Sequence, residues 1–363
     1  MTKKILIATG GTGGHVIPAY SLANYLMRNN YDINITIDNR GLKFLKKYKN
    51  INFTTIESSP FIKKSFLRAV ISLFIISYSI LKSLLFLLFN RPSIVIGMGG
   101  YSSFPICIAA AILNIEVVIY ESNLIIGKAN KYLLPFVKKI FVSFKELEGI
   151  PKKYSNKVSV IGNIVREEIL NFNNIKDDFI KFDNIRILVL GGSQAAKIFA
   201  TELPKVFDKF KYSKNSIKIF QQCQIDQNHQ LEGFYTKSQL DHEIFNFTEN
   251  IINYYSKSNL VITRSGASVL GELVNIKIPF ITIPLPTSAD NHQYKNAEFY
   301  QKKGYGYLLE EKDIKHKLFD LINSILKDKK NIEKILSNQT QYTDKDVFKN
   351  IKIHIENIIN EKN

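Results

Sequence analysis

A glycine-rich turn with a histidine is the first stretch of this chain whose residue types could do chemistry. It reads GGTGGH at residues 10–15, between an apolar run at residues 4–9 and a helical pattern at residues 19–27. Glycines let the backbone approach a ligand closely, and a helix start offers amide donors and a positive dipole end to an anion. His15 is a candidate general base because histidine titrates near neutral pH, although a histidine at a helix start is more often structural. The turn lacks both GxGxxG spacing and a P-loop lysine, so it specifies no single nucleotide fold.

Two further polar turns follow apolar runs in the same way. GMGGYSS occupies residues 97–103, and ESN occupies residues 121–123 directly after an apolar run at residues 115–120. The carboxyl ends of parallel strands meet at one edge of a sheet, where open α/β sheets bind their ligands. The three turns together therefore predict a ligand site more specifically than any one of them does.

The stretch at residues 259–297 reads strand, tight turn, helix, strand, loop and helix, and most of its polar side chains fall in the turn and the loop. RSG at residues 264–266 ends the first strand, Glu272 lies two turns into the helix, and DNHQ at residues 290–293 follows the second strand. Such hydrogen-bonding groups suit a polyhydroxylated ligand. An ordinary βαβ unit with a solvated loop is the alternative, and this stretch alone leaves it open.

Strand, glycine turn and helix alternate along most of the chain, which predicts an α/β fold with two doubly wound parallel sheets. The 363 residues suit two domains of ordinary size. We place the first Rossmann-like domain at residues 1–162 and the second at residues 163–342, because a polar stretch at residues 171–184 precedes a new strand that opens onto GGSQ at residues 191–194. A helix at about residues 343–363 is a candidate to pack back on the first domain.

The chain is strongly basic. Its formal charge of +17 comes from 49 Lys and Arg against 32 Asp and Glu, which suits polyanions, anionic membranes or phosphorylated ligands as partners. Lys, Asn and Ile are abundant throughout, so composition bias explains the charge equally well, and we predict no nucleic-acid partner. Cys107 and Cys223 stand far apart without a CxxC pattern, which favours a reducing compartment and no structural zinc. No signal peptide precedes the strand at residues 4–9, so we expect a cytoplasmic location.

Residues 66–89 form a much more apolar segment. Its longest uncharged run, residues 69–81, is bounded by Arg68 and Lys82 and falls short of the ~20 apolar residues that a bilayer-spanning helix needs. With the basic residues around it, the segment at about residues 63–91 suits a helix that lies on an anionic membrane surface. Burial in the core of the first domain is the alternative, and the segment alone supports both equally.

Seven motifs, in this order, resemble the MurG family of GT-B glycosyltransferases: GGTGGH, GMGGYSS, ESN, GN-I-VR, GGSQ, TRSGA…GE and DNHQYKNA. The resemblance covers residues 5–297. It implies two Rossmann-like domains that face each other across a cleft. It also implies inverting transfer of N-acetylglucosamine from UDP-N-acetylglucosamine to the C4 hydroxyl of the muramoyl sugar of undecaprenyl-diphospho-muramoylpentapeptide (lipid I), which gives lipid II for peptidoglycan synthesis. The enzyme would be peripheral, at the cytoplasmic face of the bacterial inner membrane.

The resemblance implies roles for single residues on the acceptor side. His15 is the leading candidate for the base that activates the acceptor hydroxyl, and Glu121 is the reserve. The acceptor would contact the turns of the first domain, at Gly13, Gly14, Gly99, Gly100, Tyr101 and Glu121.

The resemblance also implies a binding site for UDP-N-acetylglucosamine. Its residues would be Thr12, Gly13, Gly14, Asn123, Arg166, Ser193, Thr248, Ala267, Ser268, Val269, Leu270, Gly271, Glu272 and Gln293. Among them, Arg166 and Ser193 would face the diphosphate and uridine, and Thr248 falls at a uracil-contacting backbone position. Glu272 would hold the ribose hydroxyls, while Gln293 and Asn123 would contact the sugar.

Some positions depart from the family pattern. Ala195 replaces a glycine that often follows GGSQ, Ser122 replaces the Gln of EQN, and Gly271 stands where Ser is common, so side-chain contacts there are in doubt. The resemblance implies neither a cofactor nor a metal, because Arg166 and helix-start amides would stabilise the departing UDP. The DxD pattern at residues 344–346 lies in the polar tail, and we interpret it as a solvated face.

Other functions use the same residues and stay open. A GT-B relative could take another acceptor, such as diacylglycerol, or act as a UDP-sugar epimerase. A binding protein for lipid-linked sugars would share the sites without turnover. A nicotinamide-dependent oxidoreductase would use the first glycine turn together with Asp38 after the second strand, but it leaves GGSQ, Glu272 and the DNHQ loop without a role.

Overall fold

The computed structural model describes residues 3–45, 51–58, 66–172, 184–192, 196–212, 216–248 and 250–361, and the statements below concern these residues. The chain forms two compact units. Unit 1 comprises Met1–Arg166 and Asp344–Asn363, and unit 2 comprises Glu167–Thr343. The sequence analysis divides the chain after residues 162 and 342, close to these borders.

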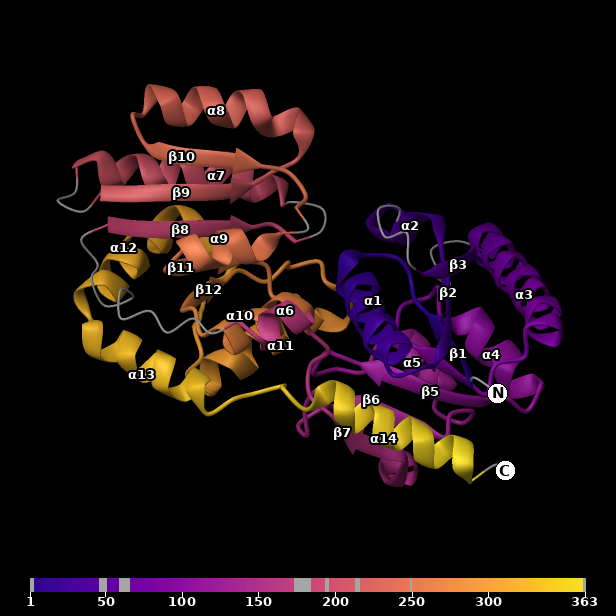
Figure 1. The fold of residues 1–363 in the computed structure, drawn as a ribbon. Helices are drawn as coiled ribbons and strands as arrows, with labels where there is room; N and C mark the ends of the chain where they lie inside the picture. Colours follow the sequence, from indigo (N-terminus) through magenta and orange to yellow (C-terminus); the bar gives the residue numbers. More distant parts are fainter. Residues whose placement is uncertain are drawn as a thin grey trace. The chain divides into compact units, whose positions relative to one another are not determined.

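The described part of unit 1 contains one parallel sheet. Its strands are β1 (Lys4–Ala8), β2 (Asp32–Ile37), β3 (Asn52–Thr55), β4 (Ile94–Gly97), β5 (Glu116–Glu121), β6 (Lys139–Val142) and β7 (Val158–Val160). Their spatial order is β3-β2-β1-β4-β5-β6-β7 (Figure 1). The central strands β1, β4 and β5 are rich in Ile and Val and are buried along most of their length, as expected when helices cover both faces of a parallel sheet.

Helices surround this sheet. They are α1 (Gly13–Arg28), α2 (Asn39–Leu45), α3 (Phe66–Phe89), α4 (Phe104–Ile112), α5 (Lys128–Leu133) and α14 (Val347–Asn360). The last of these returns from the end of the chain and packs beside α1 (Figure 1), where the rings of Tyr25 and Phe348 stack with their centroids 5.1 Å apart. The apolar spacing in the tail predicts a packed helix, and α14 is packed against α1.

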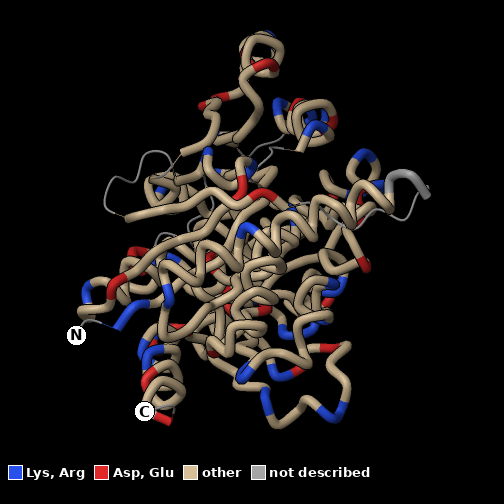
Figure 2. Tube along the Cα trace, turned by 90° about the vertical axis from the view of Figure 1, so that its right-hand side faces the viewer, with Lys and Arg blue, Asp and Glu red and all other residues tan. Residues whose placement is uncertain are grey.

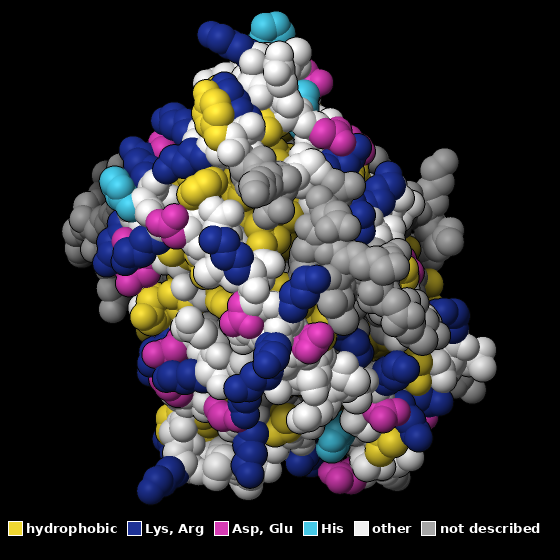
Figure 3. All heavy atoms as spheres, turned by 90° about the vertical axis from the view of Figure 1, so that its left-hand side faces the viewer, with side chains coloured by type: hydrophobic (Ala, Val, Ile, Leu, Met, Phe, Trp, Pro, Cys, Tyr) yellow, Lys and Arg dark blue, Asp and Glu magenta, His cyan; other side chains and the backbone are white. Residues whose placement is uncertain are grey.

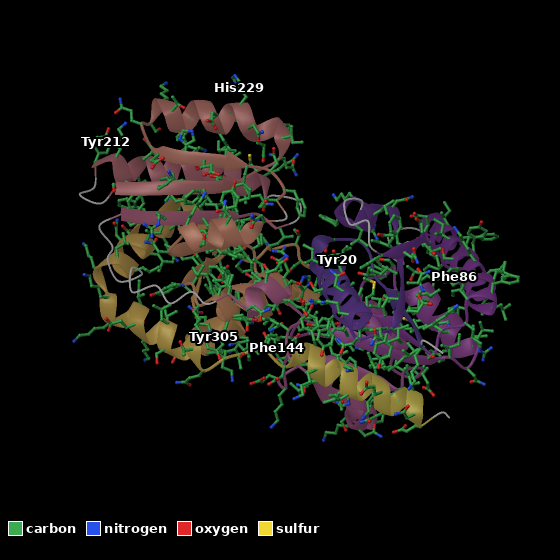
Figure 4. The ribbon with its side chains drawn as sticks, in the orientation of Figure 1. Tyr20, Phe86, Phe144, Tyr212, His229 and Tyr305 are labelled. Atoms are coloured by element: carbon green, nitrogen blue, oxygen red, sulfur yellow. The ribbon has the colours of Figure 1, made fainter. Side chains whose placement is uncertain are left out.

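Helix α3 packs against α4 with one face only. Ser72, Ser79, Ser83 and Leu87 are buried, and Phe86 is partly buried against the core of unit 1 (Figure 4). The other face exposes large apolar side chains, among them Val70, Ile71, Leu73, Phe74, Tyr78, Leu81, Leu85, Leu88 and Phe89. In Figure 2 the trace of α3 carries few charged residues.

The alternative that the apolar segment is a core helix is therefore wrong for the exposed face of α3. By length and composition Ala69–Phe89 could also cross a membrane, and it has 21 residues. In the structure, however, the face of α3 that carries the buried serines packs against α4, so the helix lies along unit 1.

The described part of unit 2 contains a second parallel sheet with the same pattern. Its strands are β8 (Asn184–Leu190), β9 (Ser216–Gln222), β10 (Asp241–Phe245), β11 (Leu260–Thr263), β12 (Phe280–Thr282) and β13 (Tyr307–Leu308), in the order β10-β9-β8-β11-β12-β13. Its helices are α6 (Glu167–Leu170), α7 (Lys197–Phe207), α8 (Asn228–Lys237), α9 (Ile251–Lys257), α10 (Ala267–Ile276), α11 (His292–Lys302), α12 (Ile314–Lys327) and α13 (Lys329–Thr340). The predicted α/β fold with two doubly wound parallel sheets is confirmed.

One face of the molecule carries charged side chains of both signs. On the face drawn in Figure 3, Lys and Arg lie interspersed with Asp and Glu. Tyr212 and His229, both exposed, mark the outer edge of unit 2 (Figure 4). This distribution fits the composition bias seen in the sequence.

The predicted solvated face at the DxD pattern is wrong for Asp344. This side chain is only 4% exposed, and its Oδ1 accepts a hydrogen bond of 2.9 Å from the main-chain nitrogen of Asn163. A Cβ on Gly162, whose φ is +95°, would lie 2.4 Å from the same oxygen. Asp344 therefore fixes the segment after β7 to the start of the C-terminal segment, because a buried carboxylate requires such donors.

Candidate active site

The strand orders identify one switch point in each sheet. In unit 1 the chain runs outward from β1 to β3 and then crosses to β4, and in unit 2 it runs from β8 to β10 and then crosses to β11. Open α/β sheets bind ligands outside the carboxyl ends of the strands at this point. The GGTGGH and GMGGYSS turns follow β1 and β4, and the RSG turn follows β11, so the predicted motifs lie at both switch points.

His15 is the third residue of α1 and is half-buried. Its Nδ1 lies 3.0 Å from the main-chain oxygen of Met98 in the second glycine turn. A carbonyl oxygen only accepts hydrogen bonds, so Nδ1 carries the proton in this contact and the neutral ring has its lone pair on Nε2. This tautomer is the one that a general base requires at Nε2. The sequence gives no signal for Met98, because the partner is a backbone oxygen.

Gly99 and Gly100 make room for the imidazole. Their φ angles are +86° and +75°, in the left-handed region that glycine tolerates. A Cβ on Gly99 would lie 3.2 Å from Cε1 of His15, and one on Gly100 would lie 3.5 Å from Cδ2. The structure therefore brings His15 together with two of the predicted acceptor-side residues. Tyr101, another of them, directly follows Gly100, and its main-chain oxygen accepts a hydrogen bond of 2.9 Å from the hydroxyl of Ser58.

Asp38 holds the first glycine turn in place. It is fully buried, and its Oδ1 accepts hydrogen bonds from the main-chain nitrogens of Gly11 (2.8 Å) and Gly41 (2.9 Å). Its Oδ2 accepts one from Nε of Arg40 at 2.8 Å. Both oxygens are thus committed within the protein, so Asp38 does not present a carboxylate to the ribose of a nicotinamide cofactor.

Glu121 lies at the end of β5 and is only 4% exposed. Its Oε1 accepts from the backbone nitrogen (3.1 Å) and Nδ2 (3.0 Å) of Asn123, and its Oε2 accepts from the nitrogen of Gly127 (2.8 Å) and Nδ2 of Asn130 (3.0 Å). Four donors replace the hydration that the buried carboxylate has lost and direct it into the loop. This environment suits a positioning group better than a base, and the base role of Glu121 stays a prediction. Asn130, which the sequence analysis missed, stands on α5 without any local motif.

In unit 2, Glu272 is the sixth residue of α10 and is 6% exposed. Its Oε2 accepts a hydrogen bond of 3.0 Å from the hydroxyl of Tyr255 on α9. Residues 267–269 form the first turn of α10, whose N-cap Gly266 makes no side-chain cap, so their amide groups point toward the edge of the sheet. The predicted nucleoside-binding segment therefore combines helix-start donors with a buried carboxylate.

Arg264 has a structural role, although it ends β11 at the switch point. Its guanidinium donates to the main-chain oxygens of Ile283 (3.1 Å) and Pro284 (3.3 Å), forms an ion pair with Glu311, and lies 4.8 Å from the ring centroid of Phe199. These contacts fix the loop after β12. The polar group that the sequence offers to a ligand is turned into the protein instead.

The other predicted donor-site residues lie in surface loops or at their borders. Gln293 is half-buried on α11, and its Oε1 accepts a hydrogen bond of 2.9 Å from Leu285, which leaves its Nε2 as the group that could donate to a sugar hydroxyl. Thr248 precedes α9 and accepts at Oγ1 from the nitrogen of Asn250 at 3.2 Å. Thr12 is the exposed N-cap of α1, and Arg166 is the half-buried last residue of unit 1 before the chain enters unit 2. Ser193 lies outside the described residues.

Several buried hydroxyl groups at these sheet edges have no hydrogen-bond partner within the described part of the chain. Among them are those of Thr9, directly after β1, of Ser102, in the second glycine turn, and of Ser265, two residues before α10. Buried polar groups are normally paired, so each hydroxyl is a group that a bound ligand or water could satisfy. Thr9 and Ser102 lie at the predicted site of unit 1, and Ser265 lies at that of unit 2.

The residues that the structure describes contain no group of three or more His, Cys, Asp or Glu that could hold a metal ion. Cys107 and Cys223 are buried free thiols. Burial raises the pKa of Cys107 to about 12 and is the main cause that raises the pKa of Cys223 to about 11. Both thiols therefore stay protonated at neutral pH, whereas the thiolate is the form that binds metals.

Comparison with known proteins identifies the relatives of this chain. Residues 5–142 match the glycosyltransferase family 28 N-terminal domain, and residues 186–351 match its C-terminal domain. A protein of Pelagibacter ubique (strain HTCC1062), "UDP-N-acetylglucosamine--N-acetylmuramyl-(pentapeptide) pyrophosphoryl-undecaprenol N-acetylglucosamine transferase", is 37% identical over 365 residues, which cover 99% of this chain and 100% of the relative.

Solved structures agree on the fold. The crystal structure of Acinetobacter baumannii MurG has a TM-score of 0.76 at 22% identity and covers 98% of this chain and 100% of that chain. UDP-GlcNAc 2-epimerase from Neisseria meningitidis, bound to UDP-GlcNAc, has a TM-score of 0.66 at 16% identity with coverage of 98% and 100%. The same fold thus serves a transferase and an epimerase. The identity along nearly the whole length of the Pelagibacter transferase decides between them: this chain belongs to the MurG family of glycosyltransferase family 28.

Proposed function

We propose that this chain transfers N-acetylglucosamine from UDP-N-acetylglucosamine to the C4 hydroxyl of the muramoyl sugar of lipid I, with inversion, to give lipid II. The name of the Pelagibacter relative supports the donor and the acceptor. The observation that supports the chemistry is the 3.0 Å contact of His15 Nδ1 with Met98, because it sets the imidazole tautomer at the switch point of unit 1.

In the proposed reaction, the C4 oxygen of the acceptor attacks C1 of N-acetylglucosamine while the bond from C1 to the β-phosphate oxygen breaks. Nε2 of His15 accepts the proton of the hydroxyl while the new bond to C1 forms. The attacking oxygen therefore does not build up positive charge. UDP leaves with the electron pair. Arg166 and the helix-start donors of unit 2 are the groups proposed to stabilise that charge, through electrostatic interactions that are stronger in the transition state than in the ground state.

The donor site is proposed to lie at the switch point of unit 2. The amides at the start of α10, the Glu272 carboxylate and the Gln293 amide are of the types that recognise a nucleoside and a sugar. Acceptor binding is assigned to the glycine turns of unit 1, where the hydroxyl of Ser102 has no hydrogen-bond partner among the described residues.

An acceptor panel tests this function. Purified protein is incubated with labelled UDP-N-acetylglucosamine and lipid I, diacylglycerol or no acceptor. We expect label in lipid II only. Label in a glycolipid of diacylglycerol, epimerised UDP-sugar without any acceptor, or donor binding without turnover would each replace the proposal with one of the alternatives.

We further propose that α3 docks on the anionic cytoplasmic surface of the inner membrane, where a lipid-linked acceptor would reside. The exposed apolar face of α3 supports insertion into the headgroup region, with Phe74 at 77% and Tyr78 at 68% exposure. Lys82 and Arg91 stand along or just beyond the helix and would attract anionic lipid. A flotation assay with anionic liposomes tests this, and absence of the protein from the liposomes at every salt concentration would contradict it.

A further inference from the structure

Two adjacent tyrosines of α9 point to different neighbours. The ring of Tyr254 stacks on Phe245 with a centroid distance of 3.9 Å, and its hydroxyl donates to Oε1 of Glu243 at 2.8 Å, both on β10. The hydroxyl of Tyr255 donates instead to Oε2 of Glu272 on α10 at 3.0 Å. Successive helix residues are turned by about 100°, so one short helix is fixed to the sheet by Tyr254 and to α10 by Tyr255.

The contact between Tyr255 and Glu272 is buried on both sides. Tyr255 is 1% exposed and Glu272 is 6% exposed. An ionised carboxylate in such a place costs free energy unless donors compensate for its lost hydration, and the phenol supplies one. The bond also restricts the rotamers of a side chain that would otherwise lose entropy on binding a ligand.

The position of α9 connects this contact to the rest of the donor site. Thr248, the predicted uracil-contacting position, lies three residues before the start of α9, and its hydroxyl accepts from the nitrogen of the N-cap residue Asn250. The same short helix therefore follows the predicted base-reading loop and carries the hydroxyl that contacts the predicted ribose-binding carboxylate. A shift of α9 would therefore move both the loop that carries Thr248 and the hydroxyl of Tyr255.

We propose that Tyr255 is a positioning residue for recognition of the donor ribose: its hydroxyl holds the Glu272 carboxylate in the orientation that accepts hydrogen bonds from the 2′ and 3′ hydroxyls. This inference rests on the proposed function, in particular on the ribose role of Glu272. It predicts that Tyr255 acts on the choice between a ribonucleotide and a 2′-deoxyribonucleotide donor, although it touches neither.

The test compares KM for UDP-N-acetylglucosamine with KM for its 2′-deoxyuridine analogue, at saturating lipid I. We expect Tyr255→Phe to raise KM for the ribonucleotide donor about tenfold, as loss of one buried hydrogen bond implies, and to leave kcat within about twofold. The ratio of KM for the 2′-deoxy donor to KM for the ribonucleotide donor should fall by a similar factor. Glu272→Gln should remove most of the discrimination. The double variant should match Glu272→Gln alone, because both changes act on one contact.

Two control variants separate positioning from general stability. Tyr254→Phe removes the neighbouring hydroxyl, and Tyr235→Phe removes an equally buried hydroxyl that donates to Gln221 elsewhere in unit 2. Both should keep the wild-type ratio. The ratio of two KM values does not depend on the folded fraction, so it stays measurable in a destabilised variant.

The outcomes are distinguishable. No transfer by the wild-type protein with either donor contradicts the proposed function, and wild-type transfer without ribose discrimination contradicts the role of Glu272. Wild-type discrimination that Tyr255→Phe retains in full, or effects of Tyr255→Phe and Glu272→Gln that simply add, overturn the inference about Tyr255.

Discussion

Nδ1 of His15 lies 3.0 Å from the main-chain oxygen of Met98. The contact joins the first turn of α1 to the loop after β4, so the two glycine turns of unit 1 are fixed to each other through the imidazole. Any change that moves the second turn should therefore act on the ring, and a Cβ added at Gly99 in that turn would lie 3.2 Å from Cε1 of His15.

Gly99→Ala should lower kcat by about tenfold to a hundredfold, because a methyl group would lie 3.2 Å from Cε1 of His15 and a positive φ of +86° strains any other residue. Steady-state kinetics with lipid I measures this. Gly233→Ala is the matched control, since a Cβ there meets nothing within 4 Å and its helix should gain stability. Equal kcat values for the two variants would contradict the assigned packing of the ring.

Glu121→Gln should act mainly on stability. The amide would turn an NH₂ group toward donors that now face a carboxylate oxygen, and each mismatch in a buried site costs about 1–3 kcal/mol in the free energy of unfolding. Urea unfolding together with turnover at permissive temperature checks this. Normal stability combined with a loss of kcat larger than that of His15→Ala would make Glu121 the base.

The architecture was accessible from the sequence because the switch-point strands β1, β4 and β11 are short apolar runs that end in a glycine-rich or polar turn, and both features are local patterns. Side-chain partners were not accessible. Asn130 and Tyr255 hold carboxylates that are nine and seventeen residues away, and nothing in the sequence pairs them. The polar composition around Asp344 predicts solvent exposure, but a contact with Asn163, 181 residues away, buries it. Arg264 shows the opposite error. Its position at the end of a strand predicts a contact with the ligand, but its guanidinium packs into the protein.

Phe74→Glu combined with Tyr78→Glu should reduce binding to anionic liposomes by at least about tenfold, because each large apolar side chain contributes roughly 1.5–3 kcal/mol on full burial. Turnover with a water-soluble analogue of lipid I should stay within about twofold of wild type. Tyr212→Glu, at an 83% exposed aromatic of unit 2, serves as control and should float like wild type. Equal flotation of the wild-type protein, the double variant and Tyr212→Glu would contradict the proposed membrane contact of α3.

His354 on α14 should make stability depend on pH in the acid range. Burial, followed by the charge of Lys139, lowers the pKa of His354 below its ordinary value of 6.5. The unfolded chain therefore binds the proton more readily, so stability is complete above pH 6.5 and falls as the pH drops through the folded pKa. His354→Phe, which keeps a ring against Phe141, should lose less stability between pH 7.5 and 5 in urea unfolding. An identical loss in both proteins would contradict this.

The central claim is that His15, at the switch point of unit 1, takes the proton from the acceptor hydroxyl. The most direct measurement is turnover of lipid I by His15→Ala at saturating UDP-N-acetylglucosamine, with donor binding measured separately by calorimetry. We predict that kcat falls roughly 10²–10⁴-fold, the usual contribution of a general base, while the Kd for the donor stays within about twofold of wild type. Turnover close to that of wild type, with the donor bound equally well, would contradict the role of His15.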